Sequence, residues 1–495
     1  MLVAGFYESR VMRHLTIERT AGIILFVLLF AMAARIPTDT DTWWHIRSGE
    51  YTLQQGMIYA DPFSFTAEGR PWINHSWGAQ VLIALVWRLG GNAGLTLLTA
   101  GLATAGMALL FRISAGSLYL RAFALVLGAA AAAVFWSPRP QMLSFALSAL
   151  VLFILYLYKR RKIDRLWWLP VIMGVWGNLH AGYSIGFILI GGVFTGEVLG
   201  NLFARSSEDV ISWRGLRRLA LVGLVSVAAL LVNPYGAQIL TVPFQTVGIG
   251  ALQNHIQEWL SPDFHRRETW PFILLLIALF GAVGASRKRL DWSDFVLISG
   301  TLFMALLAGR NIALFAVVAT PALTVYLNSA LEARGWVLRP ARFASPMQAR
   351  LNAALIVLVL LGATAKLWLA VDPRAVTVAQ ADIFPVAAVE FLNRERPDGP
   401  MFNSYNWGGY LMFAAPDYPV FVDGRTDLYG DAILDDFLKT ATAGDGWRET
   451  LDAYGIRLVV VEANSGLAGA LASEPGWTLA YGDALAVVYT RESPA

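Results

Sequence analysis

Long apolar runs separated by short polar loops cover roughly the first three quarters of the chain. A helix needs roughly 20 predominantly apolar residues to cross a hydrocarbon layer about 30 Å thick, and many of these runs approach that length. Hydropathy therefore predicts about eleven membrane-spanning helices. They lie near residues 18–36, 93–112, 119–136, 142–158, 166–179, 183–203, 217–233, 270–285, 293–309, 311–330 and 351–371.

Basic residues gather in the short loops at residues 112–121, 159–165, 205–218, 287–289 and 334–350. Because Lys and Arg are enriched in cytoplasmic loops, these loops and the N-terminus are expected on the cytoplasmic side of a bacterial inner membrane. Residues 76–91 are also apolar, but a span there would invert every later loop. Since Trp87 and Arg88 close this short run, we expect a helix lying in the outer interface.

Two long loops, 37–92 and 234–269, then fall on the outer side. After residue 371, strand-like and helix-like runs alternate between turn signals, which is typical of a compact α/β domain. The predicted fold is a polytopic α-helical membrane protein with a small C-terminal extracytoplasmic α/β domain. Its two domains are 1–371, within the membrane, and 372–495, outside it.

The composition agrees with a membrane protein and argues against several classes of function. Hydrophobic residues make up 56% of the chain, charged residues 15%, and the mean hydropathy is +0.53, far from soluble averages. The net charge of +3 is small and its basic residues lie in loops, so no nucleic-acid partner is expected. Cysteine is absent. The sequence shows no phosphate loop, no GxSxG nucleophile elbow between a strand and a helix, no HExxH and no GxGxxG between a strand and a helix. This argues against an ATP-driven pump or a common hydrolase.

The first outer loop carries the strongest local motif. It reads Thr38-Asp39-Thr40-Asp41-Thr42-Trp43-Trp44-His45-Ile46-Arg47. If a helix begins near Asp41, then Asp41 and His45 share a face at i, i+4. That spacing can hold a metal, or pair a general base with its orienting group. Alternatively, Asp39 and Asp41 only cap an interfacial helix, with the tryptophans as membrane-interface residues.

Other polar groups recur at the predicted outer ends of the spans. They are Asn74, His75, Arg139, His180, Glu258 and Arg310, and the histidines at 45, 75, 180, 255 and 265 all fall on this side. Ionisable groups near the membrane usually face a bundle interior or a wet cavity, so we expect a polar outer cavity. Glu258 belongs either to a mobile flap over that cavity or to a simple interfacial helix.

The C-terminal domain contains its own charged run, Asp423-Gly424-Arg425-Thr426-Asp427. It follows the strand-like segment 418–422, and loops after strands often carry binding residues. Asp423 and Arg425 therefore either contact an acceptor or form a salt-bridged turn.

Three motifs and the overall topology resemble the GT-C glycosyltransferases. Asp41-Thr42-Trp43-Trp44-His45-Ile46-Arg47 is similar to the Asp-Pro-Trp-Phe-His-Tyr-Arg segment of the oligosaccharyltransferase branch, and Asp61-Pro62-Phe63-Ser64 with Gly69-Arg70 to the stretch that follows it there. Asn406-Trp407-Gly408-Gly409-Tyr410 resembles that branch's Trp-Trp-Asp-Tyr-Gly signature, although it lacks the aspartate. A clear Asp-x-Asp metal motif is also missing from the next outer loop along the chain, the short turn at residues 137–141. Arg139, in this turn, stands roughly where the motif would be expected.

The resemblance implies a membrane enzyme that moves a sugar, with inversion, from a polyprenyl-phosphate donor to an acceptor on the outer face. The acceptor class, whether glycan, lipid or protein, stays open. In the implied mechanism Arg139 and Arg310 bind the phosphate. Asp41 or Asp39 acts as general base, or Asp41 and His45 hold Mg²⁺ or Mn²⁺, with Zn²⁺ as the choice of a histidine-rich set.

Further candidates would orient these groups or bind substrate. They are His45, His180 and Glu258 for orientation, and Arg47, Asn74, His75, Asp423 and Arg425 for substrate. Two other functions remain open: a transporter or flippase, which would show repeat symmetry and a midplane site, and a scaffold subunit, in which the outer acids would be dispensable.

Overall fold

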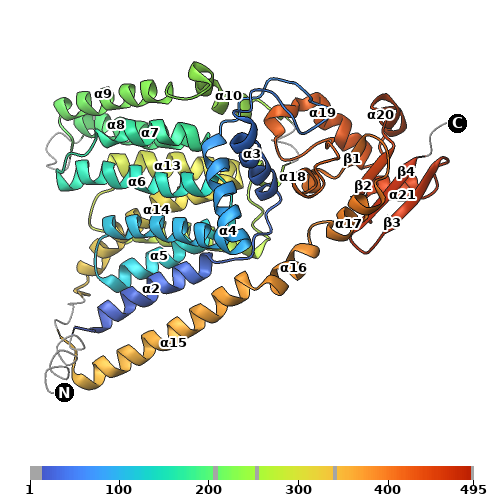
Figure 1. Cartoon of the computed structure of the whole chain (residues 1–495). Coiled ribbons are helices and arrows are strands. Elements are labelled where there is room, and N and C mark those ends of the chain that lie inside the picture. The colour runs from blue at the N-terminus through green and yellow to red at the C-terminus, as the bar shows by residue number, and fades with distance from the viewer. Residues whose placement is uncertain (1–13, 204–209, 251–255, 338–342, 492–495) are drawn as a thin grey trace.

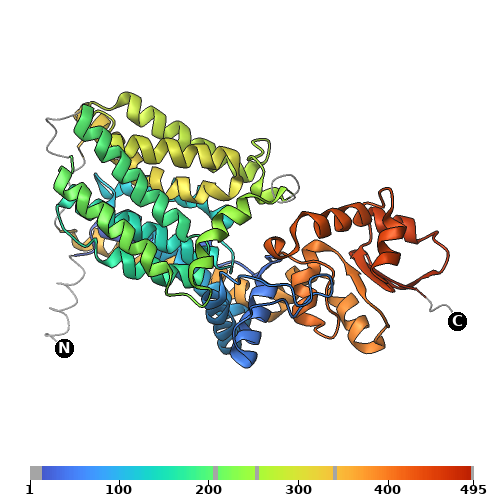
Figure 2. The ribbon, with the colours of Figure 1, turned by 90° about the horizontal axis from the view of Figure 1, so that it is seen from above.

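The computed structural model describes residues 14–203, 210–250, 256–337 and 343–491. His255 and parts of two predicted basic clusters lie outside these residues. Most of the chain forms a bundle of helices running side by side, and the C-terminal domain lies beyond one end of it (Figures 1 and 2).

Helices stand at the predicted positions of all eleven spans. They are α2 (Ile17–Ala33), α4 (Trp77–Ile113), α5 (Leu118–Ala132), α6 (Gln141–Arg161), α7 (Trp168–Leu179), α8 (Tyr183–Phe203), α9 (Trp213–Leu230), α12 (Trp270–Ala285), α13 (Trp292–Leu307), α14 (Ile312–Glu332) and α15 (Pro346–Val371).

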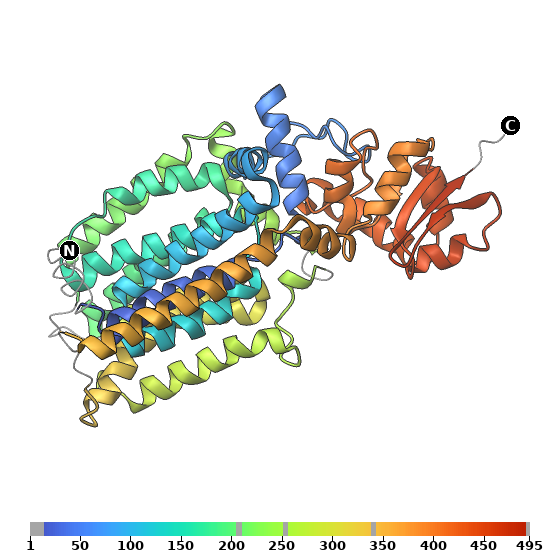
Figure 3. The ribbon, with the colours of Figure 1, turned by 60° about the horizontal axis from the view of Figure 1, so that its bottom comes forward.

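Fewer helices qualify as spans by their own length and composition. Among the described residues seven do, or eight if the bent pair α16 (Pro373–Ala381) and α17 (Val386–Glu395) counts as one span. The others are short, at 17, 12 and 16 residues for α2, α7 and α13, while α9 has three arginines near its start. They pack among the longer helices, and α15 lies along the outside of the bundle (Figure 3).

Helix α4 breaks where the sequence predicts two separate helices. Gly91 has φ 52° and ψ −139°, a conformation that favours glycine. The part before Gly91 leaves the bundle and lies across its end beside α3 (Thr42–Gln55) (Figure 1). These two helices approach closely, because a Cβ at Gly49 would lie 2.1 Å from the Gln80 carbonyl oxygen. The predicted break is confirmed, and the position of the first part in the membrane interface stays a prediction.

The C-terminal domain is built on one four-stranded sheet. Its strands are β1 (Met401–Asn403), β2 (Leu458–Glu462), β3 (Trp477–Gly482) and β4 (Ala486–Arg491), in the order β1-β2-β4-β3. Strands β1 and β2 are parallel, with Phe402 opposite Val459, and the other pairs are antiparallel. Helices α18 (Tyr405–Ala414), α19 (Thr426–Ala441), α20 (Trp447–Ala453) and α21 (Gly466–Leu471) complete it.

One hydrophobic core joins this domain to the first long loop. Trp43, Phe63 and Trp72 of the loop pack in the same buried cluster as Phe402 and Val459. The chain segments also pair through their backbones, since Phe65 N–H donates to the Val420 carbonyl at 3.2 Å. The first loop is therefore the platform on which the C-terminal domain sits.

Candidate active site

A large cavity of about 1940 Å³ lies where the bundle, the first loop and the C-terminal domain meet. One part of its wall is polar, with side chains from the segments at 39–45, 139–141 and 256–269 and from 404–406 of the C-terminal domain. The other part is apolar. It is formed by Met142, Phe145, Ile185, Ile188, Val227, Leu230, Leu240, Phe244, Met304 and Leu314.

Arg139 is the centre of a charged cluster at the polar end. Its Nη1 lies 3.3 Å from Asp39 Oδ2, and its Nη2 lies 3.0 Å from Asp41 Oδ2. The turn before α6 presents this guanidinium, with Pro140 at the helix N-cap. Asp41 occupies the N-cap position of α3, but its side chain makes no capping hydrogen bond. Its carboxylate is therefore available to the cavity, contrary to the interpretation that it only caps the helix.

Glu258 links the two arginines of the cavity. It lies on the short 3₁₀ helix η3 (Gln257–Trp259), with its carboxylate 3.5 Å from Arg139 and 3.8 Å from Arg310. The Arg310 guanidinium also stands over the Trp259 ring, 4.3 Å from its centroid. Both contacts fix the position of the Arg310 side chain. Arg310 belongs to the 3₁₀ helix η5 (Gly309–Asn311), directly before α14.

Three histidines line the cavity beside this cluster. His180 Nδ1 accepts hydrogen bonds from the Gly182 N–H at 3.1 Å and the Ser144 hydroxyl at 2.8 Å, which leaves the proton on Nε2. Burial lowers the pKa of the His45, His75 and His180 imidazoles. They are neutral hydrogen-bonding groups near neutral pH, and each can serve as a donor to an anion.

Asp41 differs from an ordinary surface carboxyl. Burial raises its pKa to about 7, with Asp39 and Glu258 acting in the same direction and the Arg139 guanidinium acting against them. A carboxyl whose pKa lies near the working pH can exchange protons in both directions. This is the property that a general base requires.

The cavity collects most of the predicted site residues. Asp39, Asp41, His45, His75, Arg139, His180, Glu258 and Arg310 all line it.

Four predicted residues lie elsewhere. Arg47 stands 5.9 Å from the Phe63 ring centroid, and Asn74, which is 1% exposed, donates to Gln80 Oε1 at 2.7 Å. Asp423 and Arg425 are fully buried in an ion-paired cluster with Asp61. Their burial agrees with the salt-bridged turn and leaves them inaccessible to an acceptor.

The expected cation site does not fit the residues present. Among the described parts of the chain, no three His, Asp or Glu side chains lie together in a way that could hold a metal ion. Asp41 faces the Arg139 guanidinium, and His45 Nδ1 faces Gln80 Nε2 at 3.5 Å. The positive charge between the carboxylates is supplied by an arginine. In this arrangement Asp41 and His45 therefore do not form a fitting set of ligands for a divalent cation, and a metal on these two residues stays a prediction.

Sequence reasoning missed how the C-terminal domain shapes the site. A Cβ at Gly424 would lie 2.0 Å from Asp41 Oδ1, and a Cβ at Gly409 would lie 2.8 Å from the Thr40 carbonyl oxygen. Glycine is required at both positions by this close approach. Sequence reasoning singles out both motifs, Asp423-Gly424-Arg425 and Asn406-Trp407-Gly408-Gly409-Tyr410, but it does not predict that a glycine in each packs on the acidic loop.

Several polar groups of the C-terminal domain also line the cavity without having been predicted. They are Ser404, Tyr405, Asn406, Thr426, Asp427 and Glu462. Tyr405 and Thr426 are hydrogen-bonded through their hydroxyls at 2.9 Å. The cavity therefore has one wall in each part of the molecule.

Comparison with known proteins identifies the fold through structure alone. The sequence matches no family and no curated protein. The chain is similar to ArnT from Cupriavidus metallidurans bound to undecaprenyl phosphate, with 15% identity and a TM-score of 0.51, covering 95% of this chain and 96% of that one. It is also similar to the oligosaccharyltransferase AglB from Archaeoglobus fulgidus in complex with an inhibitory peptide and a dolichol-phosphate. There the identity is 11% and the TM-score 0.57, over 90% of this chain and 69% of that one. The protein is a polytopic membrane protein with the fold of the GT-C glycosyltransferases, as its motifs and topology predict.

Proposed function

We propose that this protein is a glycosyltransferase that moves a sugar from a polyprenyl-phosphate donor to an acceptor on the outer face of the membrane. The observation that carries the proposal is the cavity itself, in which Arg139 and Arg310 stand at the polar end of a long apolar wall. A lipid-linked sugar has the matching chemistry, with an anionic head between a sugar and an apolar chain. The polyprenyl lipids bound by ArnT and AglB support the same class of donor.

The two arginines would bind the donor phosphate. Guanidinium groups bind phosphate oxygens in a bidentate manner, and at present the Glu258 carboxylate lies between Arg139 and Arg310. The phosphate would take that place, with Glu258 moving aside. His180 lies near both arginines and can donate its Nε2 proton to a further phosphate oxygen.

Asp41 would act as the general base. It accepts the proton of an acceptor hydroxyl, whose oxygen attacks the anomeric carbon of the sugar. The bond from that carbon to the phosphate oxygen breaks, and the polyprenyl phosphate leaves with the bonding electron pair. Arg139 and Arg310 stabilise the charge that develops on the phosphate. A single displacement of this kind inverts the anomeric configuration.

The acceptor would approach from the C-terminal domain. Tyr405, Asn406 and Thr426 line that side of the cavity, opposite the apolar wall formed by the bundle. A transporter is less well supported, because its substrate site is expected near the midplane. Here Asp41, Arg139 and Arg310 all lie at helix ends, directly before or at the start of α3, α6 and α14.

The test compares wild type with Asp41→Asn in purified membranes supplied with radiolabelled polyprenyl-phosphate sugars. We expect transfer or hydrolysis by wild type and its loss in the variant. Asp382→Asn, at an exposed position outside the cavity, is the matched control and should retain activity. If wild type neither binds nor consumes any donor, the proposal fails. Full activity of Asp41→Asn would overturn the role of the base.

A further inference from the structure

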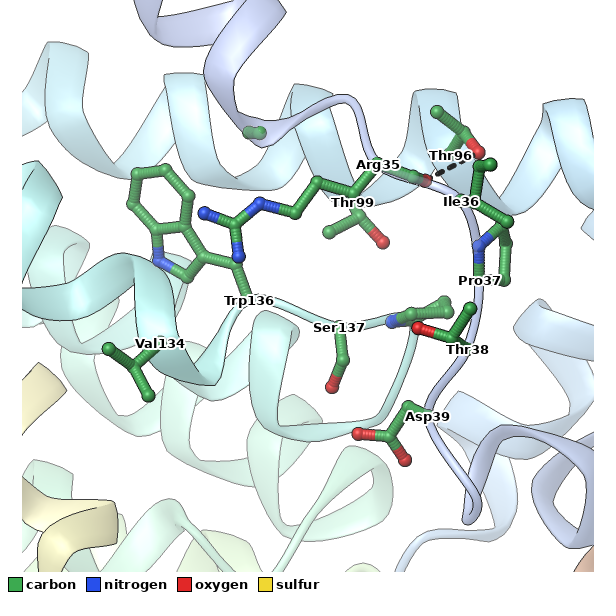
Figure 4. A pocket seen from close by; sticks show the side chains of 12 residues that line it. Arg35, Ile36, Pro37, Thr38, Asp39, Thr96, Thr99, Val134, Trp136 and Ser137 are labelled. Carbon is green, nitrogen blue, oxygen red and sulfur yellow. Dashed lines mark hydrogen bonds between the residues drawn. The ribbon is translucent and has the colours of Figure 1, made fainter. Parts of the chain in front are cut away.

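A second, smaller pocket of about 220 Å³ adjoins the main cavity at the end of α2 (Figure 4). It is bounded by the segment 33–39, by α4 and by the turn at 134–138. Asp39, Val134, Trp136 and Ser137 line both spaces. Asp39 is also paired with Arg139 at 3.3 Å, so the pocket begins next to the arginine that faces the main cavity.

Its inner wall contains a buried hydroxyl with no partner. Thr99 is 4% exposed, and its Oγ1 makes no hydrogen bond. One turn earlier, Thr96 donates to the carbonyls of Arg35 and Asn92 at 3.0 and 2.9 Å. Figure 4 shows the Thr99 and Thr38 hydroxyls on facing sides of the pocket. Burying a hydroxyl without a hydrogen-bond partner is unfavourable, and a ligand that hydrogen-bonds to Thr99 would account for it.

Polar groups of both kinds surround this space. Asp39 offers acceptors, while Thr38, Thr99 and Ser137 offer hydroxyls that donate or accept. Arg35 is held in the wall, since its guanidinium donates to the Met32 and Ala133 carbonyls at 3.3 and 2.9 Å. A carboxylate and several hydroxyl groups around one small space suit a ligand with several hydroxyl groups of its own.

The size of the pocket limits that ligand. Its volume corresponds to roughly seven water molecules at about 30 Å³ each and lies below the roughly 300–1,000 Å³ of sites for drug-sized ligands. A single sugar ring is of this scale, whereas an oligosaccharide or an isoprenoid chain is not.

We propose that this pocket binds the sugar ring of the lipid-linked donor, with Thr99 hydrogen-bonded to one of its hydroxyls; this inference rests on the proposed function. The pocket lies on the bundle side of the site, formed by the end of α2 and by α4. The C-terminal domain lines the main cavity but not this pocket. A sugar ring bound beside Asp39 would lie next to a phosphate bound to Arg139, because these two side chains are paired. The donor requires this proximity, since a single glycosidic bond joins its sugar to its phosphate.

The experiment measures dissociation constants of the purified full-length protein in detergent for three probes. These are undecaprenyl phosphate, undecaprenyl-phosphate-mannose and undecaprenyl-phosphate-arabinose. Wild type should bind a sugar-bearing carrier more tightly than undecaprenyl phosphate. Thr99→Val, which removes the hydroxyl at nearly constant volume, should weaken that binding by about fivefold, the worth of one neutral hydrogen bond. Its affinity for undecaprenyl phosphate should not change.

Thr104→Val is the matched control. Thr104 is on the same helix and its hydroxyl is also unpartnered, but it lines neither space, so its variant should bind all probes like wild type. Thr38→Val, in the loop, tests the pocket independently if Thr99→Val does not fold.

Wild type that prefers a sugar-bearing carrier, with both pocket variants unchanged, would overturn this inference and leave the proposed function intact. Wild type that binds none of the probes would remove the proposed function itself.

Discussion

Asp41 is placed by three neighbours, two of which come from distant parts of the chain. Arg139 pairs with its carboxylate at 3.0 Å, Asp39 Oδ1 accepts its backbone N–H at 3.0 Å, and Gly424 leaves room for it. The surrounding protein removes it from water, so its pKa is raised in spite of the arginine. At the scale of single residues, the site is a carboxyl whose protonation and position are both controlled by packing.

The raised pKa predicts the pH dependence of activity. The base must be ionised, so kcat/KM should rise with pH and level off above the Asp41 pKa of about 7. Stability should change in the opposite direction. Since the folded-state pKa lies above the ordinary value of 3.8, the folded state binds the extra proton, and this contribution is lost as pH rises through about 7. A pH–rate profile of wild type measures the first effect, and a flat profile between pH 5 and 9 would contradict it.

Gly424 predicts a loss of activity without loss of fold. In Gly424→Ala the new Cβ would meet Asp41 Oδ1 at 2.0 Å, so the carboxylate must shift. A displacement of about 1 Å can reduce catalysis about 100-fold, and we expect a fall in kcat of that order. Gly469→Ala in α21, where a Cβ meets nothing within 4 Å, should leave kcat unchanged. Equal kcat values for the two variants would show that the close approach does not position Asp41.

At the scale of elements, the segment 256–269 covers the polar end of the cavity. Its η3 helix places Glu258 between Arg139 and Arg310, and the Leu260 carbonyl accepts the Gly309 N–H at 2.9 Å. The segment is therefore tied to the start of α14 through both a side chain and its backbone. These contacts favour the interpretation of Glu258 as part of a cover over the cavity.

This arrangement predicts that Glu258 competes with the donor phosphate. Glu258→Gln removes a carboxylate from between the two guanidinium groups, so undecaprenyl phosphate should bind about threefold more tightly, as for a weak, partly exposed ion pair. Equilibrium binding to purified protein measures the change. Glu395→Gln, whose exposed carboxylate pairs with Arg394 at 2.8 Å outside the cavity, should have no effect. Weaker binding by Glu258→Gln would mean that this carboxylate positions the arginines for the phosphate.

At the scale of the whole molecule, the first loop and the C-terminal domain form one unit. Arg425 is fully buried and pairs with Asp61 of the loop and Asp423 of its own segment, while the Tyr429 hydroxyl donates to Asp423 at 2.7 Å. Trp72 of the loop also donates to Asp427 at 3.0 Å. The acidic loop is thus held in place by the domain that supplies the opposite wall of the cavity.

Arg425→Ala should therefore weaken this unit. Removing one partner of a buried ion pair leaves uncompensated charge and typically costs about 3–5 kcal/mol. We expect limited proteolysis to cut residues 372–495 at a markedly lower temperature than in wild type. Arg448→Ala breaks the exposed pair with Glu474 and should change the cleavage temperature little. Equal cleavage temperatures for the two variants would contradict a role for the buried cluster in holding the domain.

Local sequence determined the architecture of this protein. Apolar runs predicted the helices of the bundle, the break near Gly91 and the change of character after residue 371, because burial in a bilayer depends on the composition of each segment alone. The resemblance of short motifs indicated the fold. These motifs and the polar groups at the predicted span ends together supplied eight residues that line the cavity.

Only the tertiary structure decided how those residues are used. Arg139 meets Asp41 and Glu258 through the packing of segments about 100 residues apart, and no local pattern contains that distance. The same packing buries Asp423 and Arg425, brings Gly424 against the acidic loop and leaves Thr99 facing a pocket. Hydropathy shows that a polar side chain next to an apolar segment needs a hydrogen-bonding or charged partner. Which partner it finds depends on which helices become neighbours.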